Sequence, residues 1–151
     1  MAGVRFSRGD GLLLAALLAA VGIAVSAYLA WQWYASAGAS WCDIGSYFSC
    51  SRVRESPFAA VAGIPTAMVG VVGFAILLLL TFLALRGRER IGPWTTDHSL
   101  VAFSLVGGAI GTGLTIIEIA VIQAVCVLCV LGFVLDLAIL GIGVSLTRGD
   151  G

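Results

Sequence analysis

The segment Ile64–Leu85 has the sequence IPTAMVGVVGFAILLLLTFLAL and carries no charged side chain. A helix needs roughly 20 mainly apolar residues to cross the hydrocarbon core of a bilayer, so this segment is long enough to be a transmembrane helix. Comparable apolar runs precede and follow it. We expect transmembrane helices at about 12–34, 65–85, 99–122 and 124–146, with a loop at 35–64. These segments fill most of the chain, which predicts one all-α integral membrane domain, a four-transmembrane-helix bundle.

The amino-acid composition also indicates a protein embedded in a lipid bilayer. Hydrophobic residues make up 60% of the chain and charged residues 11%, whereas charged residues make up about 25% of a typical soluble domain. The formal net charge is +0 and the sequence shows no basic helix face. A nucleic-acid partner is therefore not expected.

The arginines predict the orientation in the membrane. All eight basic residues are Arg, and only Arg52 and Arg54 fall in the loop 35–64. The others flank the opposite side of the predicted bundle: Arg5, Arg8, Arg86, Arg88, Arg90 and Arg148. Positive residues concentrate in cytoplasmic loops, so we expect a multi-pass plasma-membrane protein with both termini and the loop 86–98 in the cytoplasm. The loop 35–64 and the turn near Gln123 are then extracytoplasmic.

This topology brings four cysteines to one face of the membrane. Cys42 and Cys50 belong to the outer loop, and Cys126 and Cys129 lie at the beginning of the last helix. Residues three apart on a helix are neighbours, so the second pair can form a disulfide. A thiol at a helix N-terminus has a lowered pKa, and the thiolate is the species that attacks disulfides. The pattern predicts redox-active cysteines.

Two structural interpretations of the cysteines remain open. A zinc site commonly uses two short Cys-x-x-Cys pairs, and the wider spacing of Cys42 and Cys50 argues against one, so no metal is expected. Two permanent disulfides in a non-enzymatic membrane scaffold are the other alternative. A bridge within one helical turn closes a very short loop and adds little stabilisation, which favours the redox interpretation.

Several short segments around the cysteines form a distinctive set. They are Cys42-Asp43-Ile44, Ser49-Cys50-Ser51-Arg52-Val53, Ser56-Pro57-Phe58, Gly63-Ile64-Pro65, Gly70, Glu118, Val121-Ile122-Gln123-Ala124-Val125-Cys126 and Cys129. In these segments the chain resembles the vitamin K epoxide reductase family, and its bacterial members in particular. The hydropathy pattern extends the resemblance over nearly the whole chain.

The resemblance implies a bundle around a quinone of the menaquinone, ubiquinone or vitamin K type, capped outside by a loop. It also implies an electron path. Cys42 exchanges disulfides with a thioredoxin-like extracytoplasmic partner, Cys50 passes electrons to Cys126, and Cys129 lies closest to the membrane quinone. Residues 46–55 are expected to form a short capping helix. The enzyme so implied is a quinone-dependent thiol-disulfide oxidoreductase that generates disulfides in exported proteins.

Helical spacing from Cys129, together with family position, predicts the residues that approach the quinone: Thr66, Met68, Val69, Glu118, Leu128 and Phe133. Thr66 and Phe133 stand where the animal enzymes have Asn and Tyr. Three alternative functions therefore stay open: a vitamin K quinone or epoxide reductase, a DsbB-like oxidase, and the scaffold with structural disulfides.

Three polar residues need separate interpretation. Glu118 is a candidate polar partner or proton route beside the quinone, since acidic groups within membranes are usually functional. Asp136 is expected roughly 15 Å deeper than Cys126, at 1.5 Å per residue, and to hydrogen-bond within the bundle. His98 lies on the side opposite the cysteines and is expected to have a capping or interfacial role.

The topology is testable with fusions. A reporter fused after Leu146 should be cytoplasmic and one inserted near Gly38 should be extracytoplasmic, because the arginine distribution orients the bundle. Alkaline phosphatase and fluorescent-protein activity measure the two locations. An extracytoplasmic C-terminus would contradict the expectation that both cysteine pairs share one face.

Overall fold

A computed structural model describes residues 7–35, 60–61, 64–88 and 90–149. The remaining residues of the outer loop, including Cys42, Cys50 and the helix expected at 46–55, lie outside the described residues. The helices are α1 (Arg8–Ala35), α3 (Thr66–Leu85), α4 (Thr96–Ile117), the π-helical turn η2 (Glu118–Ile122) and α5 (Val127–Gly149). The strands are β1 (Ala60–Val61), β2 (Ile64–Pro65), β3 (Arg90–Ile91) and β4 (Trp94–Thr95).

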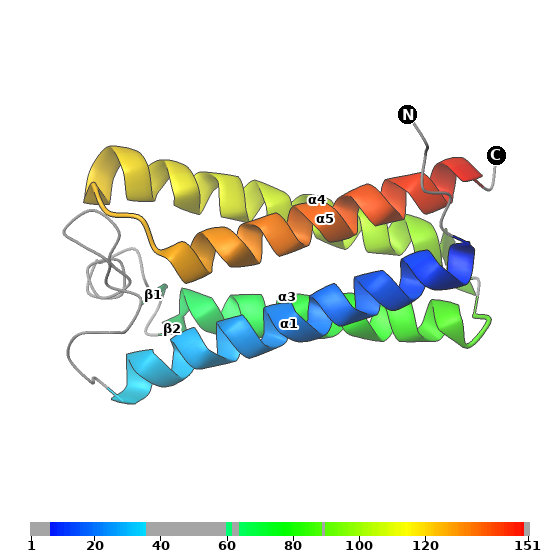
Figure 1. Ribbon diagram of the computed structural model, residues 1–151, viewed down its shortest axis with the longest axis horizontal. Coiled ribbons are helices and arrows are strands. Elements are labelled where there is room, and N and C mark those ends of the chain that lie inside the picture. The colour runs from blue at the N-terminus through cyan, green and yellow to red at the C-terminus, as the bar shows by residue number, and fades with distance from the viewer. Residues whose placement is uncertain (1–6, 36–59, 62–63, 89, 150–151) are drawn as a thin grey trace.

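The helices form two antiparallel pairs, with α1 beside α3 and α4 beside α5 (Figure 1). The start of α1 and the end of α5 lie at one end of the bundle, which also holds Arg86 and Arg88; we call this the arginine end. The turn between α4 and α5 lies at the other end, with the start of α3; we call this the cysteine end. Each short hairpin, β1 with β2 and β3 with β4, is antiparallel and precedes a long helix.

The predicted fold class is confirmed. Within the described part of the chain, four helices are long and apolar enough to cross a membrane: Arg8–Tyr34, Thr66–Leu85, Thr96–Ile122 and Val127–Arg148. Large apolar side chains also cover the outside of the bundle, as at Leu17 and Leu79, which are 61% and 56% exposed. An apolar surface of this kind is favourable in contact with lipid and unfavourable in contact with water.

Two helices begin earlier than the hydropathy pattern predicts, because polar side chains hold their first turns. α1 begins at Arg8, whose guanidinium binds both carboxylate oxygens of Asp97 at 2.7 and 3.0 Å. α4 begins at Thr96, after Thr95 accepts a hydrogen bond of 3.2 Å from the His98 amide. His98 therefore belongs to the capped first turn of α4 at the arginine end, and the Arg8–Asp97 ion pair joins α1 to α4.

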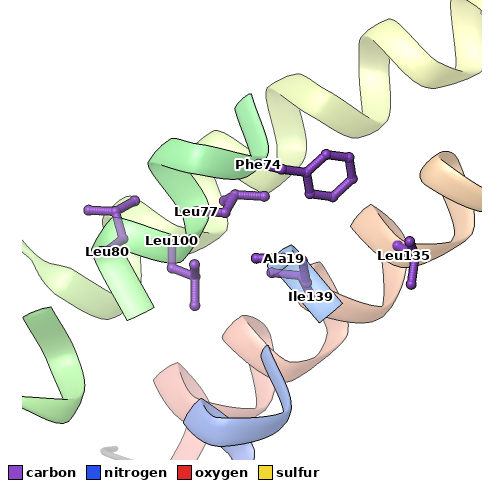
Figure 2. Close-up of a cluster of buried hydrophobic side chains, with 7 residues drawn as sticks. All are labelled: Ala19, Phe74, Leu77, Leu80, Leu100, Leu135 and Ile139. Atoms are coloured by element: carbon purple, nitrogen blue, oxygen red, sulfur yellow. The ribbon is translucent and has the colours of Figure 1, made fainter. Parts of the chain in front are cut away.

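The core is an apolar cluster near the middle of the bundle, to which every long helix contributes. Figure 2 shows its members, Ala19, Phe74, Leu77, Leu80, Leu100, Leu135 and Ile139. Small residues let the helices approach closely around it. Gly22 of α1 faces the Phe74 ring of α3, and a Cβ at Gly22 would lie 2.4 Å from Phe74 Cδ1. This contact leaves no room for a larger residue.

Replacing Gly22 with Ala should therefore destabilise the bundle, although Ala has the higher helix propensity. Overpacking of this kind costs about 1–3 kcal/mol, and thermal unfolding in detergent measures the loss. Gly141→Ala is the control, since a Cβ there meets nothing within 4 Å and should leave the melting temperature equal or higher. Equal melting temperatures for Gly22→Ala and the wild type would contradict the close packing of α1 on α3.

Candidate redox site

The turn at the cysteine end is built by a change of helix type. The last turn of α4 widens into the π-helical η2, and Gln123 then takes a left-handed conformation with φ 56° and ψ 35°. The Ala124 amide donates to the Glu118 carbonyl at 3.1 Å. The chain therefore leaves α4 before residue 124, and α5 begins at Val127 and not at 124 as predicted.

Glu118 ties this turn to the start of α5. Its side chain is buried, and Oε2 accepts a hydrogen bond of 3.2 Å from the Cys126 amide. The first amides of a helix have no partner within the helix and need acceptors from elsewhere. In this membrane protein the acceptor for Cys126 is a carboxylate carried by the preceding helix.

Cys126 occupies the capping position of α5. Its sulfur accepts a hydrogen bond of 3.3 Å from the Cys129 amide, and its carbonyl accepts one of 3.0 Å from Val130. The sulfur takes the place of the side-chain oxygen of an Asn or Ser at a helix N-cap, and the carbonyl accepts the first hydrogen bond of the helix. Cys126 is buried and Cys129 is half-buried.

The thiol groups of Cys126 and Cys129 also interact with each other. A hydrogen bond from the Cys129 thiol is the main cause that holds the pKa of the Cys126 thiol below its ordinary value. Burial opposes this effect, as does the negative charge of Glu118, while the Cys129 and Leu128 amides favour the thiolate. The Cys129 thiol is hydrogen-bonded to Glu118 as well. Cys126 is thus the sulfur better suited to carry negative charge.

Both cysteines border a cavity of about 650 Å³, within the range of roughly 300–1,000 Å³ that small-molecule sites have. All the residues predicted to approach a quinone line this one cavity: Thr66, Met68, Val69, Glu118, Leu128 and Phe133. Their assignment to a bound quinone remains a prediction. Cys42 and Cys50 lie outside the described residues.

The cavity wall is mostly apolar and includes side chains of α3 and α4 that are exposed at the bundle surface. Val72 of α3 and Val106 of α4 line the cavity and also face outward, at 56% and 58% exposure. Phe133 closes over Gly111 of α4, where a Cβ would lie 2.4 Å from the ring. A cavity of this size and lining suits a mainly apolar small molecule.

Sequence reasoning missed some polar residues of the cavity. Ser26 and Gln32 of α1 line it, and the Gln32 amide donates to the Tyr28 hydroxyl at 2.8 Å. Asp136 lines it too, and its Oδ2 is buried without a hydrogen-bond partner. The expectation that Asp136 hydrogen-bonds within the bundle is therefore wrong for this oxygen. These polar residues are isolated on helices that are otherwise apolar on every face. The sequence therefore shows no helical periodicity of polar residues that would reveal them.

Among the described residues, no three His, Cys, Asp or Glu side chains gather in an arrangement that could hold a metal ion. Acidic and sulfur groups do meet at the cysteine end, where the Cys129 thiol and the Cys126 amide hydrogen-bond to the Glu118 carboxylate and the two cysteine side chains hydrogen-bond to each other. This arrangement fits thiol chemistry next to an apolar cavity.

Comparison with models of protein families gives a match over most of the chain. The family model described as "Vitamin K epoxide reductase family" matches residues 13–144, from the first turns of α1 to near the end of α5. A search of the curated proteins found no match to this chain.

The contact between the thiols predicts a pKa effect. Cys129→Ala should raise the pKa of Cys126, because it removes the main hydrogen bond that favours the thiolate. The measurement uses a Cys42→Ala, Cys50→Ala background and the rate at which methyl methanethiosulfonate modifies Cys126. At pH values below the pKa of Cys126, this rate should fall by about tenfold for each unit by which the pKa rises. Leu131→Ala is the control from the same helix. An unchanged pH profile for Cys129→Ala would contradict the role of the Cys129 hydrogen bond.

Proposed function

This chain belongs to the vitamin K epoxide reductase family and is a membrane oxidoreductase, and we propose that it oxidises a thioredoxin-like extracytoplasmic partner and passes the electrons to a lipid quinone. The observation that carries the proposal is the position of the Cys126–Cys129 pair in the wall of an apolar cavity open toward lipid. The thiols of this pair can act on a molecule that never leaves the membrane.

The stoichiometry of the reaction is balanced. Oxidation of the Cys126 and Cys129 thiols to a disulfide releases two electrons and two protons, and a quinone, when bound, takes up the same number as it becomes a hydroquinone. The chain's own part is to hold the dithiol and to exclude water from it. Glu118 accepts a hydrogen bond from the Cys129 thiol and can receive its proton.

We propose that the relay runs from the partner to Cys42, then Cys50, Cys126 and Cys129. The Cys50 thiolate attacks Cys126 of the oxidised pair, which forms a Cys50–Cys126 bridge and releases the Cys129 thiolate. Cys42 then attacks Cys50, and Cys126 leaves as a thiolate. A thiol of lower pKa is the better leaving group, and the hydrogen bonds at the start of α5 lower the pKa of Cys126.

The arginines support an extracytoplasmic location for this site. Arg8, Arg86, Arg88 and Arg148 lie at the arginine end, away from Cys126 and Cys129. By the positive-inside rule the arginine end faces the cytoplasm and the cysteine end faces the compartment where disulfides form. We propose that the whole chain is one membrane domain, completed at the cysteine end by the loop 35–64.

The alternatives are weaker on specific grounds. The family match argues against a DsbB-like oxidase. The hydrogen bond between the Cys126 and Cys129 side chains, which lowers the pKa of Cys126, favours a reactive pair over structural disulfides. Epoxide reduction lacks support because Thr66 and Phe133 replace the polar Asn and Tyr of the animal enzymes.

The test is anaerobic mixing of purified protein with a short-chain quinone and a reduced thioredoxin-like substrate, followed by quinone absorbance. Cys129→Ala should lower quinone reduction at least 100-fold, because Cys126 has no partner with which to form the disulfide that passes two electrons to the quinone. After chemical oxidation of the Cys42–Cys50 pair, Cys126 can attack Cys50 and release the Cys42 thiolate, and the resulting Cys50–Cys126 bridge should accumulate because Cys129 is absent and cannot attack Cys126. Cys42→Ala should block oxidation of the protein substrate but keep quinone reduction by a small membrane-permeant dithiol.

The bridge is detected by mass spectrometry of the digested protein, with Leu131→Ala as the folded control. Normal quinone turnover by Cys129→Ala would contradict the proposed order. Equal loss of both activities in a folded Cys42→Ala variant would do the same. A wild-type protein that reduces no quinone under any of these conditions would refute the function itself.

A further inference from the structure

Asp136 lies two helical turns beyond Cys129 on the same face of α5. Seven residues separate the two, which corresponds to about 10.5 Å along the helix at 1.5 Å per residue. Both side chains line the same cavity. Asp136 is only 6% exposed, and the mechanism derived above assigns it no role. Asp136 therefore lies in the same cavity as Cys129 and closer to the arginine end.

The site around Asp136 has unused hydrogen-bonding capacity. Asp136 Oδ2 and the Ser104 hydroxyl are both buried, and neither has a hydrogen-bond partner. Polar groups buried in this way nearly always have a partner in native proteins. Ser104 lies one turn before Gly108 on α4. A Cβ atom added to Gly108 would lie 3.5 Å from Asp136 Oδ2. The two polar groups therefore occupy one region between α4 and α5.

Gly107 shapes this region. A Cβ at Gly107 would lie 2.9 Å from Asp136 Oδ1 and 3.1 Å from Oδ2. The carboxyl group thus fits against bare backbone, at a place where any other residue would push it aside. Burying an unpaired carboxylate in an apolar bundle is costly, so the neutral acid is the form that suits this site.

The separation of Cys129 and Asp136 matches the size of a quinone ring. Two opposite ring oxygens lie about 5 Å apart, given C=O bonds of about 1.2 Å, and a hydrogen bond adds about 3 Å at either end. A ring bound with one oxygen toward Cys129 therefore places the other near Asp136. The cavity leaves room for the ring between Phe133 and the apolar side chains of α3.

We propose that Asp136 binds the quinone oxygen that points away from Cys129. This inference rests on the proposed quinone reductase function and adds to it the group that fixes the ring. A neutral carboxyl group can donate to the carbonyl oxygen of the quinone and accept from the hydroxyl of the hydroquinone. It holds both redox states alike, so it acts on binding and orientation and not on the electron transfer itself.

The test compares Asp136→Leu with Asp136→Asn, using a small membrane-permeant dithiol as reductant and a short-chain quinone as acceptor. Asp136→Leu should raise the quinone KM about tenfold, the size expected for one buried hydrogen bond, and leave kcat nearly unchanged. Asp136→Asn keeps a donor and an acceptor and should stay within about threefold of the wild-type KM. Melting temperatures in detergent accompany each measurement.

A second pair of variants covers the case in which Asp136→Leu does not fold. Gly107→Ala displaces the carboxyl group and should raise the quinone KM, whereas Gly113→Ala on the same helix meets nothing within 4 Å and should not. A wild-type KM for either Asp136→Leu or Gly107→Ala would overturn the inference, even if their melting temperatures fell, since Asp136 would then have a structural role alone. In that outcome wild-type quinone reduction would persist, so the proposed function would still stand.

Discussion

The hydrogen bond from the Cys126 amide to the Glu118 carboxylate is the interaction on which the cysteine end depends. Lipid offers no partner for a free backbone amide, so a chain that reverses direction at membrane depth must supply its own acceptors. Glu118 supplies one and the Cys126 sulfur supplies another. The groups that complete the backbone of this turn are therefore the same groups to which we assign the transfer of electrons and protons.

This shared use explains the arrangement of the site. A thiolate at Cys126 is a stronger acceptor for the Cys129 amide than a thiol is, so the start of α5 favours the charged form of one sulfur. Cys129, one turn deeper, faces the cavity and the carboxylate. The two cysteines have the same chemistry in the sequence, but the helix start gives them different positions and different partners. A relay needs that difference, because one sulfur must meet the outer loop and the other the cavity.

The sequence was sufficient for the bundle and for the group of residues around the cavity. Apolar runs of this length indicate membrane helices, and helical spacing from Cys129 together with family position pointed to Thr66, Glu118 and Phe133, which line one cavity. Their role toward a quinone stays a prediction. The turn was not predictable, because the π-helical η2 and the left-handed Gln123 depend on a contact between Glu118 and a residue beyond the turn. The free oxygen of Asp136 was not predictable either, since it depends on how closely Gly107 approaches from another helix.

The Arg8–Asp97 ion pair has a mechanical consequence for the bundle. It fastens α1 to α4, and so one helix pair to the other, at the end farthest from the cavity. The core near the middle of the bundle joins the two pairs as well, so the helix segments beyond it, toward the cysteine end, can move most. For a segment about 20 Å long, at 1.5 Å per residue, a rotation of about 3° moves its end by about 1 Å. The cavity lies toward the cysteine end. Its width therefore responds to changes in the angle between the two helix pairs that hardly move the arginine end.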